Sequence, residues 1–171
     1  MRTKNIFLVT LLLSGCSSAT YKQDGLNETS YKLEKSSLIY ILTPKNGRYE
    51  SKQYSESGRT TAEAINSSFA EYSSQTKIIN GCSELSCAPH PLESKSTYYV
   101  VPEILHWEDR ATEWSMIPDK IKVKITVYNK NHTEVSSNIF SGKSKIWTFG
   151  GDHPEDLLEN PVSKYVKSLY Q

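Results

Sequence analysis

The sequence predicts a single two-layer α/β domain, in which a mixed sheet of about five strands packs with two main helices in the order β-α-β-β-β-β-α. Three observations support this fold class. Short apolar or alternating runs, bounded by proline, glycine and asparagine, are typical of strands. One stretch after the first such run, and another at the end of the chain, carry apolar residues at helical spacing. The length of the chain fits one domain with a self-sufficient core.

The first residues have the layout of an export signal followed by a lipidation site. Arg2 and Lys4 precede a run at 6–13 that, at about eight residues, is too short to span a membrane that needs roughly 20. Residues 13–16 read Leu-Ser-Gly-Cys and resemble the bacterial lipobox. We therefore expect a signal peptide at residues 1–15 and acyl chains, palmitate among them, on Cys16. An ordinary signal with an incidental cysteine is the alternative.

The expected anchor sets the location of the protein and the role of its first segment. Two or three acyl chains would hold the protein on its membrane permanently. Ser17 stands where an aspartate resembles a retention signal for the inner membrane of Gram-negative bacteria, so its presence favours the outer membrane, facing the periplasm. Residues 16–35 are polar and small and are expected to form a flexible tether. The α/β domain is expected at residues 36–171.

Composition limits the partners of the mature chain. Cleavage would remove Arg2 and Lys4 and leave 18 basic side chains against 19 acidic ones. This balance gives no electrostatic case for nucleic acid. The expected partners are the membrane, through the lipid anchor, and an envelope protein or glycan. No cofactor is expected.

The two remaining cysteines predict a disulfide. Cys82 and Cys87 would lie in an oxidising compartment, where such a pair is usually bridged, and closing so short a ring is worth roughly 2 kcal/mol. A redox-active pair or a metal site is the alternative. The Cys-x-x-Cys spacing is absent, however, and His90 is enclosed by Pro89 and Pro91. No metal site is predicted.

The first half of the domain is expected to hold two strands and a helix. Residues 37–42 form a short apolar run closed by a Thr-Pro pair, typical of a buried strand. Thr60 with Glu63 predicts a capping box at the start of a helix. Residues 77–79 are the second strand. The buried face of the helix is expected to carry Ala62, Ile65, Phe69 and Tyr72.

The second half is expected to contain the longest strands. Residues 98–107 predict one, and Pro102 indicates an edge position or a bulge within it. Residues 120–127 alternate between apolar side chains and lysines or threonine, which predicts an apolar inner face and a solvated outer row. Residues 135–149 are expected to supply one broken strand or two short ones, with Gly142 marking a bulge.

The chain is expected to end in a helix. Asn160 is the predicted cap and Pro161 falls in the first turn. Its buried stripe is expected to consist of Val162, Tyr165, Val166 and Leu169.

Two strand ends carry the residues with the most unusual chemistry. Trp107 and Trp114 frame a charged turn that contains Arg110, and such side chains often anchor an interface or stack on a sugar. In the alternative interpretation the tryptophans cover the ends of the core, while Arg110 pairs with Glu108 or Asp109. The turn is the first half of the candidate binding surface.

The second half of the candidate surface is a glycine turn. Gly150 and Gly151 permit a tight turn, Asp152 can cap a short helix opened by Pro154, and His153 is expected to point outward. An anion site is the alternative, but no lysine or glycine-rich phosphate motif accompanies the turn, so a structural turn is favoured.

No catalytic motif is present, so no catalytic residue is predicted. The sequence has no nucleophile elbow, no His-Glu-x-x-His and no phosphate loop. We therefore expect a non-enzymatic binding or accessory protein of the cell envelope. The alternatives are an enzyme that acts on envelope polymers through His153 and Asp152, and a purely structural lipoprotein.

Several segments together resemble a known family. The segments are 107–115, 118–121, 142–144 and the run 147–158, which is the most specific of them. They resemble an uncharacterised family of Gram-negative lipoproteins, the DUF4823 domain of unknown function, over roughly residues 36–171. The resemblance implies no activity. In element order the chain also resembles the outer-membrane activators of peptidoglycan synthases and the auxiliary subunits of lipid transporters, but no site carries over from them.

Overall fold

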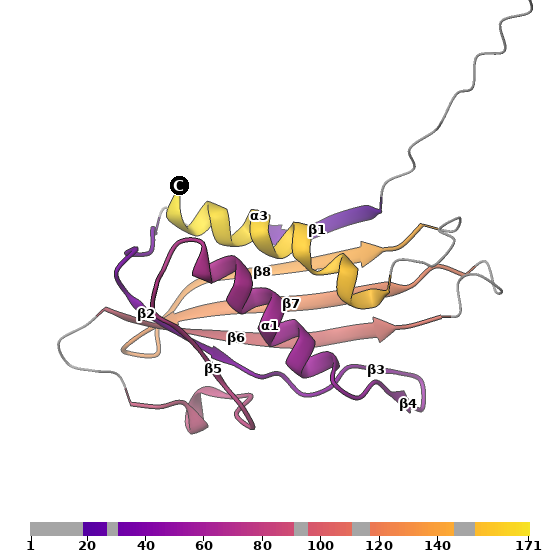
Figure 1. Ribbon diagram of the computed structural model, residues 1–171, viewed down its shortest axis with the longest axis horizontal. Helices are drawn as coiled ribbons and strands as arrows, with labels where there is room; N and C mark the ends of the chain where they lie inside the picture. Colours follow the sequence, from indigo (N-terminus) through magenta and orange to yellow (C-terminus); the bar gives the residue numbers. More distant parts are fainter. Residues whose placement is uncertain (1–18, 27–30, 91–95, 111–116, 146–152) are drawn as a thin grey trace, which may run out of the picture.

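The computed structural model describes residues 19–26, 31–90, 96–110, 117–145 and 153–171. They form a mixed sheet with two long helices on one of its faces, which confirms the predicted α/β class (Figure 1). The sheet has six strands rather than about five. The strands are β1 (Thr20–Leu26), β2 (Leu38–Leu42), β5 (Thr76–Ile79), β6 (Thr97–Glu108), β7 (Lys120–Asn129) and β8 (Glu134–Lys143).

The smaller elements surround this sheet. A separate hairpin is formed by β3 (Arg48–Tyr49) and β4 (Lys52–Gln53). The helices are α1 (Ser57–Ala70) and α3 (Glu159–Tyr170), with short 3₁₀ helices η1 (Leu85–Cys87) and η2 (Pro154–Leu157). In the described part of the chain, no helix is long and apolar enough to cross a membrane.

The strand order is β1-β8-β7-β6-β2-β5. The chain pairs β2 in parallel with both β5 and β6, and all other neighbours are antiparallel. Helix α1 is the crossover that connects β2 to β5, as a parallel pair requires. The helices therefore cover one face of the sheet and leave the other to loops and solvent (Figure 1).

The core lies between the helices and the sheet. The predicted alternation in β7 is confirmed, because its four apolar side chains are at most 2% exposed and the lysines between them lie on the opposite face. The predicted stripe of α3 is confirmed as well, since Val162, Tyr165, Val166 and Leu169 are all buried. The Tyr165 hydroxyl donates a 2.8 Å hydrogen bond to Ser136 Oγ, and burial raises its pKa to about 12.

Helix α1 begins earlier than predicted. The capping box of Thr60 and Glu63 is wrong, because the helix already starts at Ser57. The Ser57 hydroxyl donates to the Tyr54 carbonyl at 2.7 Å and accepts the Gly47 N–H at 2.8 Å. This tie to the β3–β4 hairpin fixes the first turn without a conventional cap.

Helix α3 also begins before its predicted cap. Asn160 lies inside the helix, and Leu158 is the N-cap residue. The reason is that η2 runs directly into α3 and leaves no room for a separate turn. The predicted short helix opened by Pro154 is confirmed as η2.

Part of the expected tether belongs to the sheet. Residues 16–35 were expected to be flexible, but Thr20–Leu26 form β1, which pairs with β8. The Leu33 N–H also donates to the Leu169 carbonyl at 2.8 Å, so the chain is fixed against the end of α3 before residue 36. A polar edge strand has no strong apolar pattern, which is why its composition resembles that of a tether.

Strand β8 is continuous, contrary to the prediction of a broken or doubled strand at 135–149. The expected bulge at Gly142 is wrong, because Gly142 lies in register with both Ile121 and Tyr21. The glycine has a packing role instead: a Cβ there would lie 3.0 Å from Leu157 Cβ. The irregular register lies at the other end of the strand, beside Val127. Residues 146–149 lie outside the described ranges.

Candidate functional site

A bulge in β6 decides which side chains reach each face of the sheet. Ile104 pairs with Val123 and His106 pairs with Lys122, so Leu105 has no partner in the register. Side chains alternate along a regular strand, and one extra residue reverses every face beyond it. His106 and Glu108 therefore lie on the face that the helices leave uncovered, while Trp107 turns toward the core. Pro102 precedes the bulge and lies past the pairing with β2, which ends at Val100.

Trp107 is a core residue. Its side chain is 3% exposed, and a Cβ on Gly47 would lie 2.5 Å from the Trp107 Cβ. Its predicted place on a binding surface is therefore wrong, because the bulge at Leu105 points the indole inward. For this tryptophan the structure agrees with the alternative interpretation, in which the ring covers the end of the core.

Arg110 is engaged within the protein. Its Nε donates to Glu108 Oε1 at 2.7 Å, and its guanidinium lies 4.8 Å from the centre of the Tyr49 ring. The structure thus gives Arg110 the pairing with Glu108 that the sequence offered as an alternative. Its contacts hold the end of β6 against the β3–β4 hairpin.

Most of the other predicted surface residues are not tested by the structure. Trp114, Gly150, Gly151 and Asp152 lie outside the described residues, as does Cys16. His153 is exposed at the start of η2, where its backbone N–H donates to Asp156 Oδ2 at 2.9 Å. The described residues show a different polar site at the end of β6, which the sequence did not predict.

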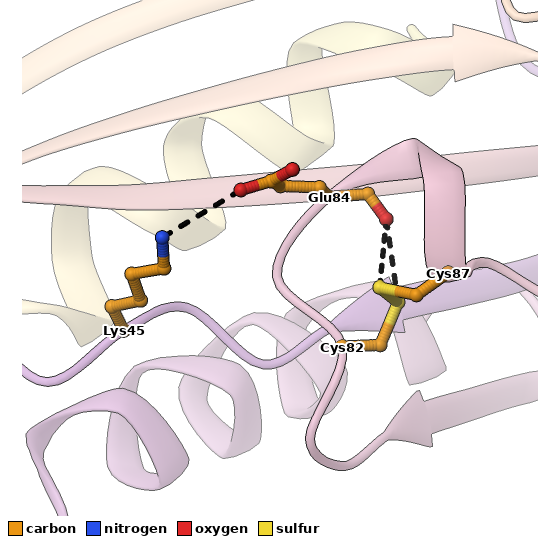
Figure 2. Close-up of a disulfide and its surroundings, with 4 residues drawn as sticks. All are labelled: Lys45, Cys82, Glu84 and Cys87. Carbon is orange, nitrogen blue, oxygen red and sulfur yellow. Dashed lines mark hydrogen bonds and ion pairs between the residues drawn. A yellow bond between two sulfur atoms is a disulfide. The ribbon is translucent and has the colours of Figure 1, made fainter.

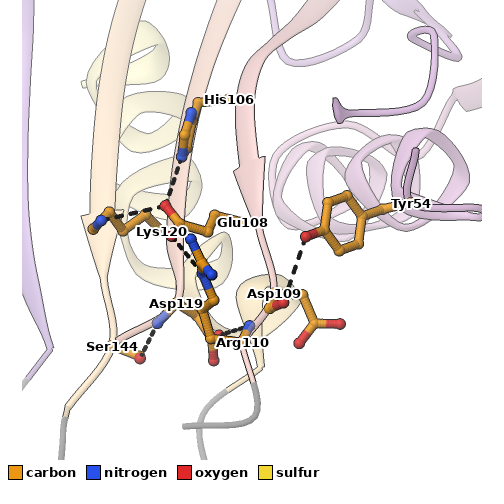
Figure 3. A network of polar contacts seen from close by, with 8 residues as sticks. All are labelled: Tyr54, His106, Glu108, Asp109, Arg110, Asp119, Lys120 and Ser144. Carbon is orange, nitrogen blue, oxygen red and sulfur yellow. Dashed lines mark hydrogen bonds and ion pairs between the residues drawn. The ribbon is translucent and has the colours of Figure 1, made fainter. Parts of the chain in front are cut away.

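The new site is built around Glu108 (Figure 3). Its side chain is 2% exposed, and its carboxylate meets His106 Nε2 at 3.1 Å and Lys120 Nζ at 3.2 Å, besides Arg110. His106 lies two residues before Glu108 on β6, Arg110 lies two residues after it, just past the end of the strand, and Lys120 is the cross-strand partner of Glu108. Three potential cations thus converge on one carboxylate.

The charge of Glu108 is set by two opposing effects. Burial works to raise its pKa, but hydrogen bonds from Arg110, His106 and Lys120 together outweigh burial and hold the pKa below its ordinary value. The hydrogen bond to Glu108 likewise raises the pKa of Arg110. Glu108 is therefore an anion at neutral pH whose oxygens are occupied by donors.

A second buried acid fixes the ends of the neighbouring strands. Asp119 is 1% exposed and accepts the Arg110 backbone N–H at 2.5 Å through its Oδ1. The Asp119 N–H in turn donates to Ser144 Oγ at 2.9 Å, so β6, β7 and β8 are joined where they end (Figure 3). These hydrogen bonds lie beside the Glu108 network.

The uncovered face is hollowed next to this network. A hollow of about 470 Å³ extends over β1, β8, β7 and β6, and we call it the basic hollow. Two rows of cross-strand neighbours form its floor. The first row is Lys22, Ser141, Lys122 and His106, and the second is Thr20, Lys143 and Lys120, with the buried Glu108 beyond Lys120 and outside the lining. Leu105, 42% exposed, also lines it.

Among the residues that the structure describes, most lysines of the basic hollow have no acidic partner. Lys120 is paired with Glu108, but Lys22, Lys122 and Lys143 contact no acidic side chain among the described residues. Lys143 also lies directly opposite Lys120. The sequence predicted the outward lysines of β7, but β1 and β8 add theirs only through the fold, so no local pattern could have revealed the hollow.

The disulfide loop packs against the other end of this face of the sheet (Figure 2). The predicted bridge between Cys82 and Cys87 is present, with their Cα atoms 5.6 Å apart. Together with η1, the loop packs on a second apolar cluster that includes Tyr40 and Tyr99, whose rings stack at 5.7 Å. The disulfide loop thus covers one end of this face, and the basic hollow lies toward the other end.

A second hollow of about 470 Å³ lies beside the disulfide loop. Its lining has mixed charge, because it includes Glu103 as well as Lys45 and Glu84, which form an exposed 3.6 Å ion pair (Figure 2). Among the described residues, no group of His, Cys, Asp and Glu side chains could hold a metal ion. The second hollow therefore has both acidic and basic side chains in its lining, whereas the charged side chains that line the basic hollow include no acid.

Comparisons with known proteins assign the family. Residues 31–169 match the model of the domain of unknown function DUF4823. The chain belongs to this family. The match starts near the contact between Leu33 and α3 and runs almost to the end of that helix, so it covers the described helices and strands except β1. A comparison with curated proteins gives no match.

Solved structures share the fold of this DUF4823 domain at low identity. Two structures of the PelC dodecamer from Paraburkholderia phytofirmans match with TM-scores of 0.61 and 0.62 at 12% and 11% identity. Each match covers 88% of this chain and 96% of the other. Protein XCC0632 from Xanthomonas campestris, of the DUF330 family, matches with a TM-score of 0.50 at 12% identity, over 80% of this chain and 85% of its own. These likenesses concern the fold alone.

Proposed function

We propose that the protein is a lipoprotein of the bacterial envelope, anchored through Cys16 in the outer membrane and facing the periplasm. The Leu-Ser-Gly-Cys sequence at residues 13–16 supports the anchor. The bridge between Cys82 and Cys87 supports an oxidising compartment such as the periplasm, because structural disulfides persist there.

We further propose that the protein acts by binding and not by catalysis. The observation that carries this proposal is the uncovered sheet face, which is hollowed beside the Glu108 network and again beside the disulfide loop. Glu108 is unsuited to act as a base because its oxygens already accept hydrogen bonds from three side chains. His153 stands apart from both hollows.

The anchor is tested by metabolic labelling with a palmitate analogue. Wild-type protein should incorporate the label and sediment with membranes, whereas a Cys16→Ser variant should do neither. Labelling of the Cys16→Ser variant would refute the assignment of the lipidated residue.

The binding face is tested by photo-crosslinking in cells. A photoreactive residue at Leu105 places the probe on the uncovered face, and one at Lys164, exposed on α3, places it on the helical face as a control. We expect a discrete adduct from position 105 and none from position 164. Adducts from 164 alone would assign binding to the helices, and adducts from neither would contradict a binding role.

Assembly of the chain with itself is a second candidate function. The PelC structures are dodecamers, and in the described part of this sheet both outer strands, β1 and β5, have a free edge to which another chain could add. Light scattering on the purified lipoprotein in a neutral detergent would support this candidate if it gave a mass of several chains. A mass of one chain would exclude it.

A further inference from the structure

The basic hollow brings several lysines close together on one face of the sheet. Lys120 and Lys143 are direct cross-strand partners, and like charges in that position destabilise a sheet. Lys120 lies 3.2 Å from the Glu108 carboxylate, and Lys143 has no counter-charge among the described residues. Because the mature chain is close to neutral, this concentration of lysines is a local feature and not a consequence of composition.

The donors of the basic hollow come from separate strands and converge on one space. Lys22 and Lys122 flank Ser141 in one row, and Lys143 lies beside Thr20 in the next. Successive residues on one face of a strand are about 7 Å apart, so the two rows lie within reach of a single ligand. Lysine ammonium groups and hydroxyls are donors for an anion that has several acceptor oxygens.

We propose that the basic hollow binds the phosphate group of an anionic ligand, with Lys22, Lys122 and Lys143 as its contacting residues. This inference rests on the proposed binding role of the uncovered sheet face and names the chemistry that the face recognises. Glu108 holds Lys120 and His106 in place at the border of the site, and Lys120 adds its share of the positive field.

The size of the basic hollow fits this ligand class. About 470 Å³ lies within the common range of small-ligand sites, roughly 300 to 1,000 Å³, and exceeds what a lone phosphate needs. Leu105, which is 42% exposed, adds apolar surface to the lining, so the organic part of a phosphate ester has somewhere to pack. The phosphate is carried either by a lipid headgroup or by a free small molecule.

The second hollow provides a contrast. Glu84 and Glu103 line it, so an anion placed there would meet acidic side chains. Its Lys45 is already paired with Glu84. We therefore assign anion binding to the basic hollow alone.

The test is calorimetric titration of the purified lipidated chain in a neutral detergent at about 0.15 M salt, where the Debye length is roughly 8 Å. One arm uses pyrophosphate, and the other uses glycerophosphoglycerol, the soluble headgroup of phosphatidylglycerol. Glycerophosphocholine, which has no net charge, is the ligand control. Each ligand is titrated into the wild type, into Lys122→Glu with Lys143→Glu, and into Lys130→Glu with Lys164→Glu. The last pair changes the charge equally at exposed lysines outside the hollow.

We expect wild-type binding of at least one phosphate ligand, a loss of at least tenfold in affinity in the Lys122/Lys143 variant, and unchanged affinity in the Lys130/Lys164 variant. Binding of glycerophosphoglycerol alone would indicate a lipid headgroup, and binding of pyrophosphate alone a free phosphate. No binding by the wild type, or equal losses in both variants, would overturn the inference.

The crosslinking experiment separates this inference from the proposed function. If the probe at Leu105 captures a component while neither phosphate ligand binds, the face binds something other than phosphate and only the inference fails. If that probe captures nothing and no ligand binds, both fail.

Discussion

At the scale of single residues, Glu108 is the acid on which the end of the sheet depends. A carboxylate that is 2% exposed is stable as an anion only where donors replace water, and Arg110, His106 and Lys120 do so here. Removing the charge would leave these donors without their acceptor.

Glu108→Gln should lower the free energy of unfolding by about 2 kcal/mol at neutral pH, because hydrogen bonds to a buried charge are lost. The pKa of Glu108 is lowered by folding, so its stabilising effect is present above the unfolded pKa of about 4.3 and is lost as the pH falls through the folded value. Urea unfolding from pH 7 to pH 2 should show the difference between variant and wild type shrinking below about pH 4. A difference that stays constant down to pH 2 would contradict this account. Glu63→Gln, on the exposed side of α1, is the control and should have a much smaller effect.

Lys143 is expected to lower the stability of the fold while contributing to ligand binding. Lys143→Glu would replace a like-charge cross-strand pair by an opposite-charge pair with Lys120, so the free energy of unfolding should rise by about 0.5 kcal/mol. Urea unfolding at low salt checks this. The control is Lys130→Glu in the turn after β7. A lower free energy of unfolding for Lys143→Glu would mean that Lys143 stabilises the fold through a partner within the protein, which would contradict its assignment to a ligand.

At the scale of elements, the bulge at Leu105 separates what the sequence could predict from what it could not. Periodicity located β2, β5, β6, β7 and the buried stripe of α3 because each is a local pattern. One unpaired residue in β6 then reversed the faces of His106, Trp107 and Glu108. The sequence placed functional chemistry at this strand end, yet assigned the exposed role to Trp107, which the bulge buries.

The disulfide loop is held by a covalent bridge between Cys82 and Cys87. Its ring closes only a few residues, so Cys82→Ala with Cys87→Ala should lower the free energy of unfolding by about 2 kcal/mol. The same double variant should make Tyr99 and the second apolar cluster more accessible, because the loop covers them. Urea unfolding measures the first effect and hydrogen exchange the second. An unchanged midpoint would show that packing alone holds the loop, and phosphate binding in the basic hollow should be unaffected in either case.

At the scale of the whole molecule, the two long helices cover one face of the sheet and leave much of the other face open to a ligand (Figure 1). The helices bury the apolar side of the strands, while the other side carries the lysines of β1, β7 and β8. The net charge does not reveal this arrangement, because acidic and basic side chains are nearly equal in number but are distributed unevenly over the surface. Composition therefore could not identify the basic hollow, and only strand order brings Lys22, Lys122 and Lys143 together.

The most direct test of this division is acetylation footprinting of lysines, read by mass spectrometry, in intact cells and on the purified protein. Our account predicts that Lys22, Lys122 and Lys143 react less in cells than in the purified protein, because a ligand covers the uncovered face there. Lys164 on α3 and Lys130 in the turn should react equally in both settings. Protection of Lys164 with full reactivity of the three lysines of the basic hollow would contradict the account and assign binding to the helical face.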